Sequence, residues 1–499
     1  MTNSAGPRPR HIARWLLIGA GVFALLYAAL LIPESTPVVS AGAGRPVFAW
    51  RQDAFWTELE QAMVAARALD HGQLTLRIDA AMVRLDEQLA ELTGVPRSPD
   101  DGAFAVLEAS LFRLAPLMAV QPARLADYVT LVTRTRRAVK EHSCAWDLNA
   151  LPARQRLYRL LFGTRMALEE VLLQLPADGP FPERIRGDDE PSATPAASLL
   201  GLPVHSGDIL VSRGGAPTSA LIARGNDYPG AFSHVALVHV EPGTQRVAII
   251  ESHIERGVVV STLEEYVRDK KLRILVLRPR ADLPAIAADP MRPHRAAAAA
   301  LTEVRRRHIP YDFAMDHRDH GAQFCSEVAS AAYESAGLKL WMGVSFISSP
   351  TVTAWLASIG VRHFETQEPA DLEYDAQLRV VAEWRDRATL FKAHVDDAVT
   401  DVMLAEAKPG EPLSYRRLLL PLARLSKAYS LVRNALGRVG PIPEGMSATA
   451  ALRVDRYRAE HRALGDRVLM LAEDFKRERG YVPPFWELVR LARQAKREG

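Results

Sequence analysis

Residues 232–238, Phe232-Ser233-His234-Val235-Ala236-Leu237-Val238, decide how the middle of this 499-residue chain is expected to fold. Short apolar, β-branched runs are typical of strands, and successive side chains of a strand point to opposite faces. His234 is therefore expected to begin a strand and to share one face with Ala236 and Val238. Similar runs recur along the chain, and we expect them to form one sheet: 209–211, 235–240, 247–250, 258–260, 272–277 and 377–384.

Helical periodicity flanks this β-rich middle. Phe55, Leu59 and Met63 have helical spacing near the start of a region that extends to about residue 175, and helical sequence resumes beyond residue 387. Five prolines among residues 176–198 give that segment the composition of a linker. Within the middle, further helices are expected after a capping box at Thr262, over 295–307 and over 325–336.

The N-terminus contains an uncharged run from Trp15 to Ile32, which as a helix would rise roughly 27 Å. This length is typical of a transmembrane helix. Arg8, Arg10 and Arg14 precede the run, so the positive-inside rule predicts a cytoplasmic N-terminus and a periplasmic location for the rest of the chain. A cleaved signal peptide ending near 41–43 is the alternative.

Composition excludes several classes of protein. Apolar residues make up 48% of the chain, which allows a sizeable core and more than one domain. The 62 basic and 59 acidic residues nearly cancel, so nothing favours nucleic-acid binding. The predicted division is a cytoplasmic N-terminus (1–14), a transmembrane anchor (15–32), an α-helical domain (45–175), a Pro-rich linker (176–199), an α+β domain (200–386) and a C-terminal α-helical region (387–499).

Three residues of the α+β domain have the chemistry of a nucleophilic site. Cys325 lies at a predicted helix start, where free N–H groups and the positive end of the helix dipole favour a thiolate. His234 precedes it by 91 residues, and Glu251 ends the next strand-like run. Neighbouring strands would set Glu251 beside His234, where its carboxylate is expected to hold the Nδ1 proton. His253, on the same strand face as Glu251, is an alternative third member.

Six motifs, in order, resemble those of the YiiX/YaeF-type permuted papain-like hydrolases. These proteins are relatives of the NlpC-type cell-wall endopeptidases, with a circularly permuted chain in which the histidine strand precedes the cysteine helix. The resemblance covers about residues 200–385. The motifs are Gly207-Asp208-Ile209-Leu210, Ser233 to Val238, Ile250-Glu251, Leu263-Glu264-Glu265-Tyr266, Tyr311-Asp312 and Phe324-Cys325-Ser326-Glu327.

The resemblance implies a permuted papain-like cysteine hydrolase domain over 200–386, so the expected fold class is α+β. The flanking α-helical regions and the N-terminal transmembrane helix lie outside the resemblance and are expected from the sequence pattern alone. The resemblance implies that Cys325 is the nucleophile, His234 the base and Glu251 the orienting residue, with no cofactor or metal. The expected reaction is hydrolysis of an amide bond through a thioester, with cell-wall peptides as the substrate class. Family members often have tyrosine before the cysteine, whereas this chain has Phe324, so the backbone N–H of Cys325 or Ser326 would serve the oxyanion.

Several alternatives stay open at this stage. Lecithin retinol acyltransferase-like proteins share the histidine-before-cysteine order and move fatty acyl groups, so an apolar channel near Cys325 would favour lipid chemistry and a polar groove would favour peptide. A non-catalytic membrane assembly protein is a further alternative. Residues 316–320, Asp-His-Arg-Asp-His, match no zinc template and are expected to form a polar loop. Cys144 and Cys325 either pair or leave Cys325 free.

Overall fold

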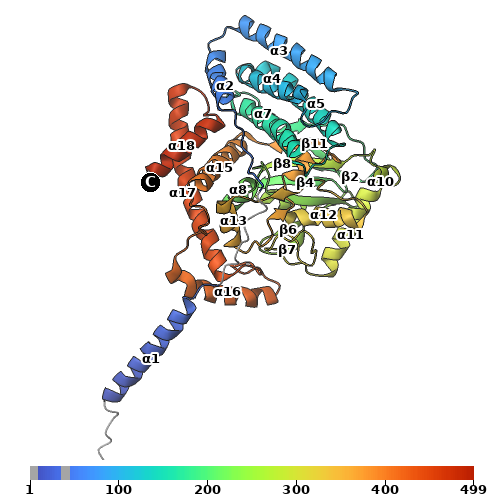
Figure 1. The fold of residues 1–499 in the computed structure, drawn as a ribbon. Helices are drawn as coiled ribbons and strands as arrows, with labels where there is room; N and C mark the ends of the chain where they lie inside the picture. Colours follow the sequence, from blue (N-terminus) through green and yellow to red (C-terminus); the bar gives the residue numbers. More distant parts are fainter. Residues whose placement is uncertain (1–8, 35–44, 499) are drawn as a thin grey trace, which may run out of the picture.

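A seven-stranded sheet forms the centre of the part of the chain that the computed structural model describes, residues 9–34 and 45–498 (Figure 1). The strand order is β1-β11-β8-β4-β5-β6-β7, and every neighbouring pair is antiparallel. The six runs predicted as strands all lie in this sheet, which confirms the expectation. The strands are β1 (Arg184–Arg186), β4 (Ile209–Gly214), β5 (His234–Val240), β6 (Val247–His253), β7 (Gly257–Ser261), β8 (Lys271–Pro279) and β11 (Leu378–Arg385).

The two faces of the sheet are buried by different partners. Val235 and Leu237 belong to the same core as apolar residues of the helix that begins at Cys325, α12 (Cys325–Ser335). On the other face, Ala236 and Val238 pack with the β2–β3 hairpin and with Tyr266 of α9. The side chains of this strand therefore alternate between the two faces of the sheet, as expected from residues 232–238. Both faces are apolar. The remaining elements of this region are β2 (Ala196–Leu199), β3 (Leu202–His205), α8 (Pro217–Arg224), α9 (Leu263–Arg268), α10 (Pro284–Ala287), α11 (Arg292–Arg306), β9 (Ser345–Phe346), α13 (Pro350–Ala357), β10 (Glu365–Thr366) and α14 (Asp371–Tyr374).

The N-terminal helical region packs directly on the sheet through buried charges as well as apolar side chains. Arg165 of α7 contacts Glu373 and Glu383, and Arg136 of α5 also binds Glu383 at 2.7 Å. These side chains are almost fully buried, so each charge depends on its ion-pair partner because it is shielded from water. The helices are α2 (Asp53–Ala66), α3 (His71–Leu92), α4 (Gly102–Met118), η1 (Pro122–Arg124), α5 (Leu125–Ser143), α6 (Leu151–Leu157), η2 (Tyr158–Phe162) and α7 (Gly163–Leu173).

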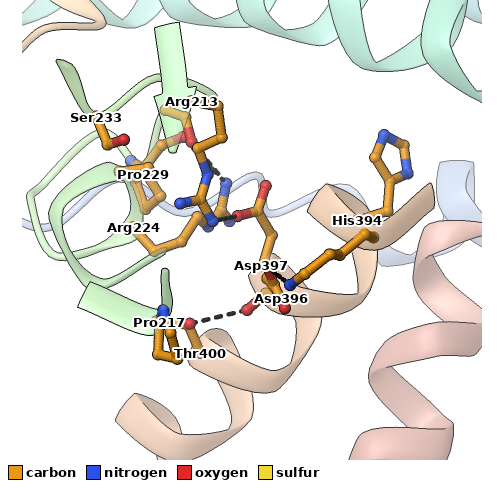
Figure 2. Close-up of polar contacts among 12 residues, drawn as sticks. Arg213, Pro217, Arg224, Pro229, Ser233, His394, Asp396, Asp397 and Thr400 are labelled. Atoms are coloured by element: carbon orange, nitrogen blue, oxygen red, sulfur yellow. Dashed lines mark hydrogen bonds and ion pairs between the residues drawn. The ribbon is translucent and has the colours of Figure 1, made fainter. Parts of the chain in front are cut away.

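The C-terminal helices are joined to the sheet at α15. Asp397 of α15 binds Arg213 of β4 at 2.7 Å (Figure 2), with side chains only 2% and 0% exposed. Asp401, one turn further, accepts two hydrogen bonds from Arg224. The C-terminal region therefore shares buried contacts with the α+β domain. Its elements are α15 (Arg387–Glu406), η3 (Arg417–Leu419), α16 (Leu420–Ala435), α17 (Ala448–Arg479) and α18 (Phe485–Arg497).

The predicted transmembrane helix at the N-terminus is wrong. Among the described residues, none of the helices combines the length and the apolar character needed to cross a membrane. The helix α1 (Pro9–Leu30) ends before the uncharged run does, and the Leu31 N–H donates its hydrogen bonds to the Tyr27 and Ala28 carbonyls. From Trp15 to Leu30 the helix rises about 24 Å, which is short of a hydrocarbon core about 30 Å thick.

The predictions that depended on this transmembrane helix are also wrong. The fold class is α+β with flanking α-helical regions and without the N-terminal transmembrane helix, and the predicted single-pass membrane localisation is wrong. The carboxyl end of α1 instead meets the C-terminal region (Figure 1), where the Tyr27 hydroxyl donates to the Leu418 carbonyl at 3.1 Å. The alternative cleavage site at 41–43 lies outside the described residues.

Candidate active site

His234 and Glu251 are brought together by the pairing of β5 with β6. Glu251 is the register partner of Ala236, so its side chain lies on the same face as that of His234. The His234 Nε2 atom is 2.8 Å from Glu251 Oε2. The contact predicted from the sequence was at Nδ1. Because the structure uses Nε2, Nδ1 is the ring nitrogen left for another partner.

Glu251 is the centre of a small buried network. Its Oε1 atom is 3.1 Å from His253 Nε2 and accepts a 2.6 Å hydrogen bond from the Ser261 hydroxyl. Burial raises the pKa of Glu251, but the hydrogen bonds from His234 and His253 outweigh that effect and hold the pKa well below its ordinary value. Glu251 is therefore an anion that fixes both imidazole rings. His253, the alternative third member, binds the same carboxylate as His234 and does not replace Glu251.

His234 is held as the neutral imidazole. Burial lowers the pKa of His234, and the hydrogen bond to Glu251 compensates only in part. A neutral ring that donates its Nε2 proton to an anionic carboxylate has a free lone pair on Nδ1. This is the form in which a histidine accepts a proton from a nucleophile.

Cys325 begins α12, as predicted, and its sulfur lies against the backbone of the histidine strand. The Sγ atom is 3.9 Å from the Ser233 carbonyl oxygen, and in the described part of the chain its hydrogen bonds do not include the His234 imidazole. Burial raises the pKa of the Cys325 thiol to about 12, although the Val235 N–H partly offsets this. The lowering expected at a helix start is thus outweighed by desolvation, and the thiol is protonated in this conformation.

Glu327 fixes the backbone at the start of α12. Its Oε2 atom accepts the Phe324 N–H at 2.9 Å, and the Glu327 N–H in turn binds the Phe324 carbonyl. Burial raises the pKa of Glu327 to about 7, against the opposing effect of the hydrogen bond from His320. The sequence alone does not predict this role for Glu327. A sequence signal for this role does exist: Glu327 lies three residues after Phe324, which is the spacing of a capping box.

Ser252 links the strand that contains Glu251 to the loop that precedes Cys325. Its hydroxyl donates to the Gln323 carbonyl at 2.7 Å. No sequence pattern marks such a contact, because it joins residues 71 positions apart. Both cysteines are free, so Cys144 and Cys325 do not pair.

Residues 316–320 form a loop whose histidine and aspartate side chains bind other residues. His320 contacts Glu327 and Glu334, each at 3.2 Å, and the Asp316 carboxylate is 3.7 Å from His363. No group of three or more potential ligands within residues 9–34 and 45–498 is arranged to hold a metal ion. Asp312 stabilises a turn, because its carboxylate accepts the N–H groups of Ala314 and Asp316.

Part of the chain is similar to known proteins. Residues 203–382 match the model of a family described as permuted papain-like amidase enzyme, YaeF/YiiX, C92 family. The crystal structure of the metalloprotein yiiX from Escherichia coli O157:H7 is similar over 36% of this chain and 97% of that chain, with 19% sequence identity and a TM-score of 0.29. The search of curated proteins found no match. The family match confirms the predicted resemblance and includes His234, Glu251 and Cys325, whereas both helical regions lie outside it.

Proposed function

Since residues 203–382 form a permuted papain-like amidase domain, and such amidases are cysteine hydrolases, we propose that this domain cleaves an amide bond with Cys325 as nucleophile, His234 as base and Glu251 as orienting residue. The observation that supports this assignment most strongly is the buried His234–Glu251 pair next to the strand backbone that the Cys325 sulfur contacts. The pair leaves Nδ1 free on a neutral ring.

The reaction proceeds in two halves. In the first, the Cys325 thiol gives its proton to His234 while sulfur bonds to the substrate's carbonyl carbon, and the amine then leaves with the proton from the imidazolium. A thioester and a free amine result. In the second half, His234 accepts a proton from water as the water oxygen attacks the thioester. The carbon–sulfur bond breaks, the acid leaves and the sulfur is reprotonated.

The raised pKa of Cys325 sets a requirement on the first step. His234 shares a sheet face with Glu251, whereas α12 packs on the other face. The sulfur must therefore leave the Ser233 carbonyl and meet the imidazole around the start of β5 before its proton is transferred, because a buried isolated thiolate is unfavourable. Glu251 stabilises the imidazolium that then forms. The Phe324 ring offers no hydroxyl to the oxyanion. The backbone N–H of Cys325 serves as the donor instead, because N–H groups at the first position of a helix have no partner within the helix.

Two classes of acyl group fit this chemistry. The family resemblance suggests peptides of the cell wall, by analogy alone. The second class is fatty acyl, whose hydrolysis or transfer uses the same thioester and differs in the acceptor. The observation that favours the second class is a mostly apolar cavity lined in part by Tyr311 and Ile254.

Activity-based labelling tests the catalytic assignment. A thiol-reactive acylating probe is applied to four proteins: wild type, Cys325→Ala, His234→Ala and Cys144→Ser. Cys144 is exposed and serves as the matched control for non-specific labelling. We expect time-dependent labelling and amide hydrolysis to persist in Cys144→Ser, to vanish in Cys325→Ala and to slow by at least a hundredfold in His234→Ala. Hydrolysis that survives in Cys325→Ala would rule out the proposed nucleophile.

A further inference from the structure

The helix α16 and the residue that caps its end present an apolar stripe to solvent. The side chains of this α16 stripe follow one another at intervals of three and four residues, the spacing at which residues share one face of a helix. A continuous apolar stripe left in water indicates a surface for a partner, because apolar side chains are otherwise stabilised by burial. The stripe consists of Leu422 and Leu425, each 64% exposed, Tyr429 (55%), Val432 (60%) and Leu436 (71%).

The opposite face of α16 is packed against the rest of the C-terminal region. Leu420 and Ala423 are buried together with Ala448 of α17. The buried Ser430 hydroxyl accepts the Ile442 N–H at 2.9 Å, which joins the helix to the segment before α17. These contacts fix the rotation of α16 about its axis. The exposure of the α16 stripe is therefore a consequence of the fold.

The segment that carries the α16 stripe is strongly basic. Residues 416–439 contain six basic side chains and no acidic one, whereas the net charge of the whole chain is only +3. Arg416 and Arg417 precede the stripe, Arg438 follows it, and all three are exposed. A helix with one apolar face and flanking Arg or Lys residues is typical of helices that lie in the interface of a membrane with anionic lipids. The other basic residues are Arg424, Lys427 and Arg433.

Charge and length argue against a second copy of this chain as the partner. Two α16 stripes packed together would bring the basic residues of one copy close to the same residues of the other. The stripe covers residues 422–436, about two heptads, whereas a coiled coil is indicated by a repeat of about three to four. An anionic bilayer avoids both difficulties, because its head groups neutralise the arginines and its acyl region accepts apolar side chains in any register.

The carboxyl end of α1 extends the apolar surface beside α16 (Figure 1). The Arg417 Nε atom donates to the Leu31 carbonyl at 3.1 Å, so this end of α1 is held against η3 although the two residues are 386 positions apart. Leu25 and Leu26 on α1 are 73% and 60% exposed. Apolar side chains from two distant parts of the sequence are thus gathered at one end of the molecule.

We propose that the α16 stripe and its flanking arginines dock this protein on the surface of a bilayer that contains anionic phospholipids. The helix lies in the plane of the interface, with its apolar side chains among the outer parts of the acyl chains and its arginines at the phosphates. Tyr429 suits this depth, because its ring is apolar and its hydroxyl accepts a hydrogen bond from Arg433 at 3.3 Å. Docking of this kind occupies one face of the bilayer and requires no helix that crosses it.

Vesicle sedimentation with the full chain tests the choice of lipid. Vesicles of phosphatidylcholine alone are compared with vesicles in which phosphatidylglycerol is mixed with it. Each basic residue near an anionic surface strengthens binding about fivefold, so we expect binding to the anionic vesicles to be at least tenfold tighter. The preference should shrink as salt is added. Equal binding to both kinds of vesicle, or to neither, would overturn the proposal.

Matched double variants test the α16 stripe itself. Leu425→Asp/Val432→Asp changes two stripe residues, and the control Leu76→Asp/Val83→Asp changes the same residue types on α3 at the same spacing of seven. The control residues are also exposed, at 73% and 57%. The α16 pair is expected to weaken binding to anionic vesicles at least tenfold and the α3 pair to leave it unchanged. Unchanged binding by the α16 pair would refute the role of the stripe.

A fluorescent label locates the contact independently of catalysis. Leu425→Cys is made in a chain that also has Cys144→Ser and Cys325→Ala, so that an environment-sensitive dye reacts at one position. Its emission is expected to shift to the blue on anionic vesicles, whereas a dye at Leu76→Cys in the same background should not respond. An equal response at both positions would contradict docking through α16. A dimer in vesicle-free solution that Leu425→Asp/Val432→Asp abolishes would assign the stripe to a second copy and overturn the proposal.

Discussion

Replacing Glu251 by glutamine removes one negative charge from the centre of the site while preserving the shape of the side chain. Glu251 is 1% exposed and binds His234, His253 and Ser261 through hydrogen bonds of 2.6–3.1 Å. A hydrogen bond to a charged group contributes about 1.5–3 kcal/mol, against about 0.5–1.5 kcal/mol for a neutral one. The imidazolium formed during catalysis therefore loses about 1–1.5 kcal/mol, and kcat/KM is expected to fall roughly tenfold.

The pH profile gives a second readout that a merely structural role would not move. Glu251 raises the pKa of His234 against the lowering effect of burial. Without that carboxylate the pKa of His234 falls further, so the neutral base persists to lower pH. The acid limb of kcat/KM is thus expected to shift to lower pH in Glu251→Gln.

The matched control is Ser261→Ala, which removes a hydroxyl donor to Glu251 and keeps the carboxylate. It should leave the acid limb in place. Both variants are assayed by amide hydrolysis between pH 4 and 8, after thermal unfolding has shown that they fold. An acid limb and a kcat/KM identical to those of wild type in Glu251→Gln would refute the assigned role.

Glu251 also links stability to pH. Its pKa is held below the ordinary value of 4.5, so the carboxylate contributes stability above that pH, and this contribution is lost as the pH falls toward the folded-state pKa. The melting temperature of wild type should therefore drop more steeply below pH 4.5 than that of Glu251→Gln.

Two further predictions concern the supports of the site. Asp397→Ala strands the fully buried Arg213 and should destabilise the fold by about 3–5 kcal/mol in chemical unfolding, whereas Asp474→Ala, whose side chain is 52% exposed, should change it by less than about 1 kcal/mol. Glu327 has a pKa raised from 4.5 to about 7, so the folded state loses stability as the pH rises through that interval. Glu327→Gln should show a flatter melting temperature between pH 5 and 8, and an unchanged slope would contradict the burial of this carboxyl.

The sheet could be predicted from the sequence because each strand is a local signal. The runs that became β4 to β8 are apolar on both faces, and the capping box at Thr262 was found where expected. The strand β1 was missed, since it has only three residues in a proline-rich segment and pairs with β11, nearly 200 positions away. Hydropathy also could not predict that α1 ends before its apolar run does.

The site residues could be named from the sequence, but their electrostatics could not. The adjacency of His234 and Glu251 follows from the order of neighbouring strands, whereas the choice of Nε2 depends on how the ring is packed. The lowered pKa predicted for the Cys325 thiol was based only on its position at a helix start. Burial under segments distant in sequence reverses it, because desolvation is a property of the assembled core.

The thioester on Cys325 is the central claim, and intact-protein mass spectrometry tests it most directly. Cys144→Ser protein is mixed with an activated acyl ester and quenched in acid within the first turnover. The account predicts one acyl adduct that maps to the peptide containing Cys325, decays in water and is absent from Cys325→Ala. An adduct that forms equally in Cys325→Ala, or product release without any adduct, would contradict it.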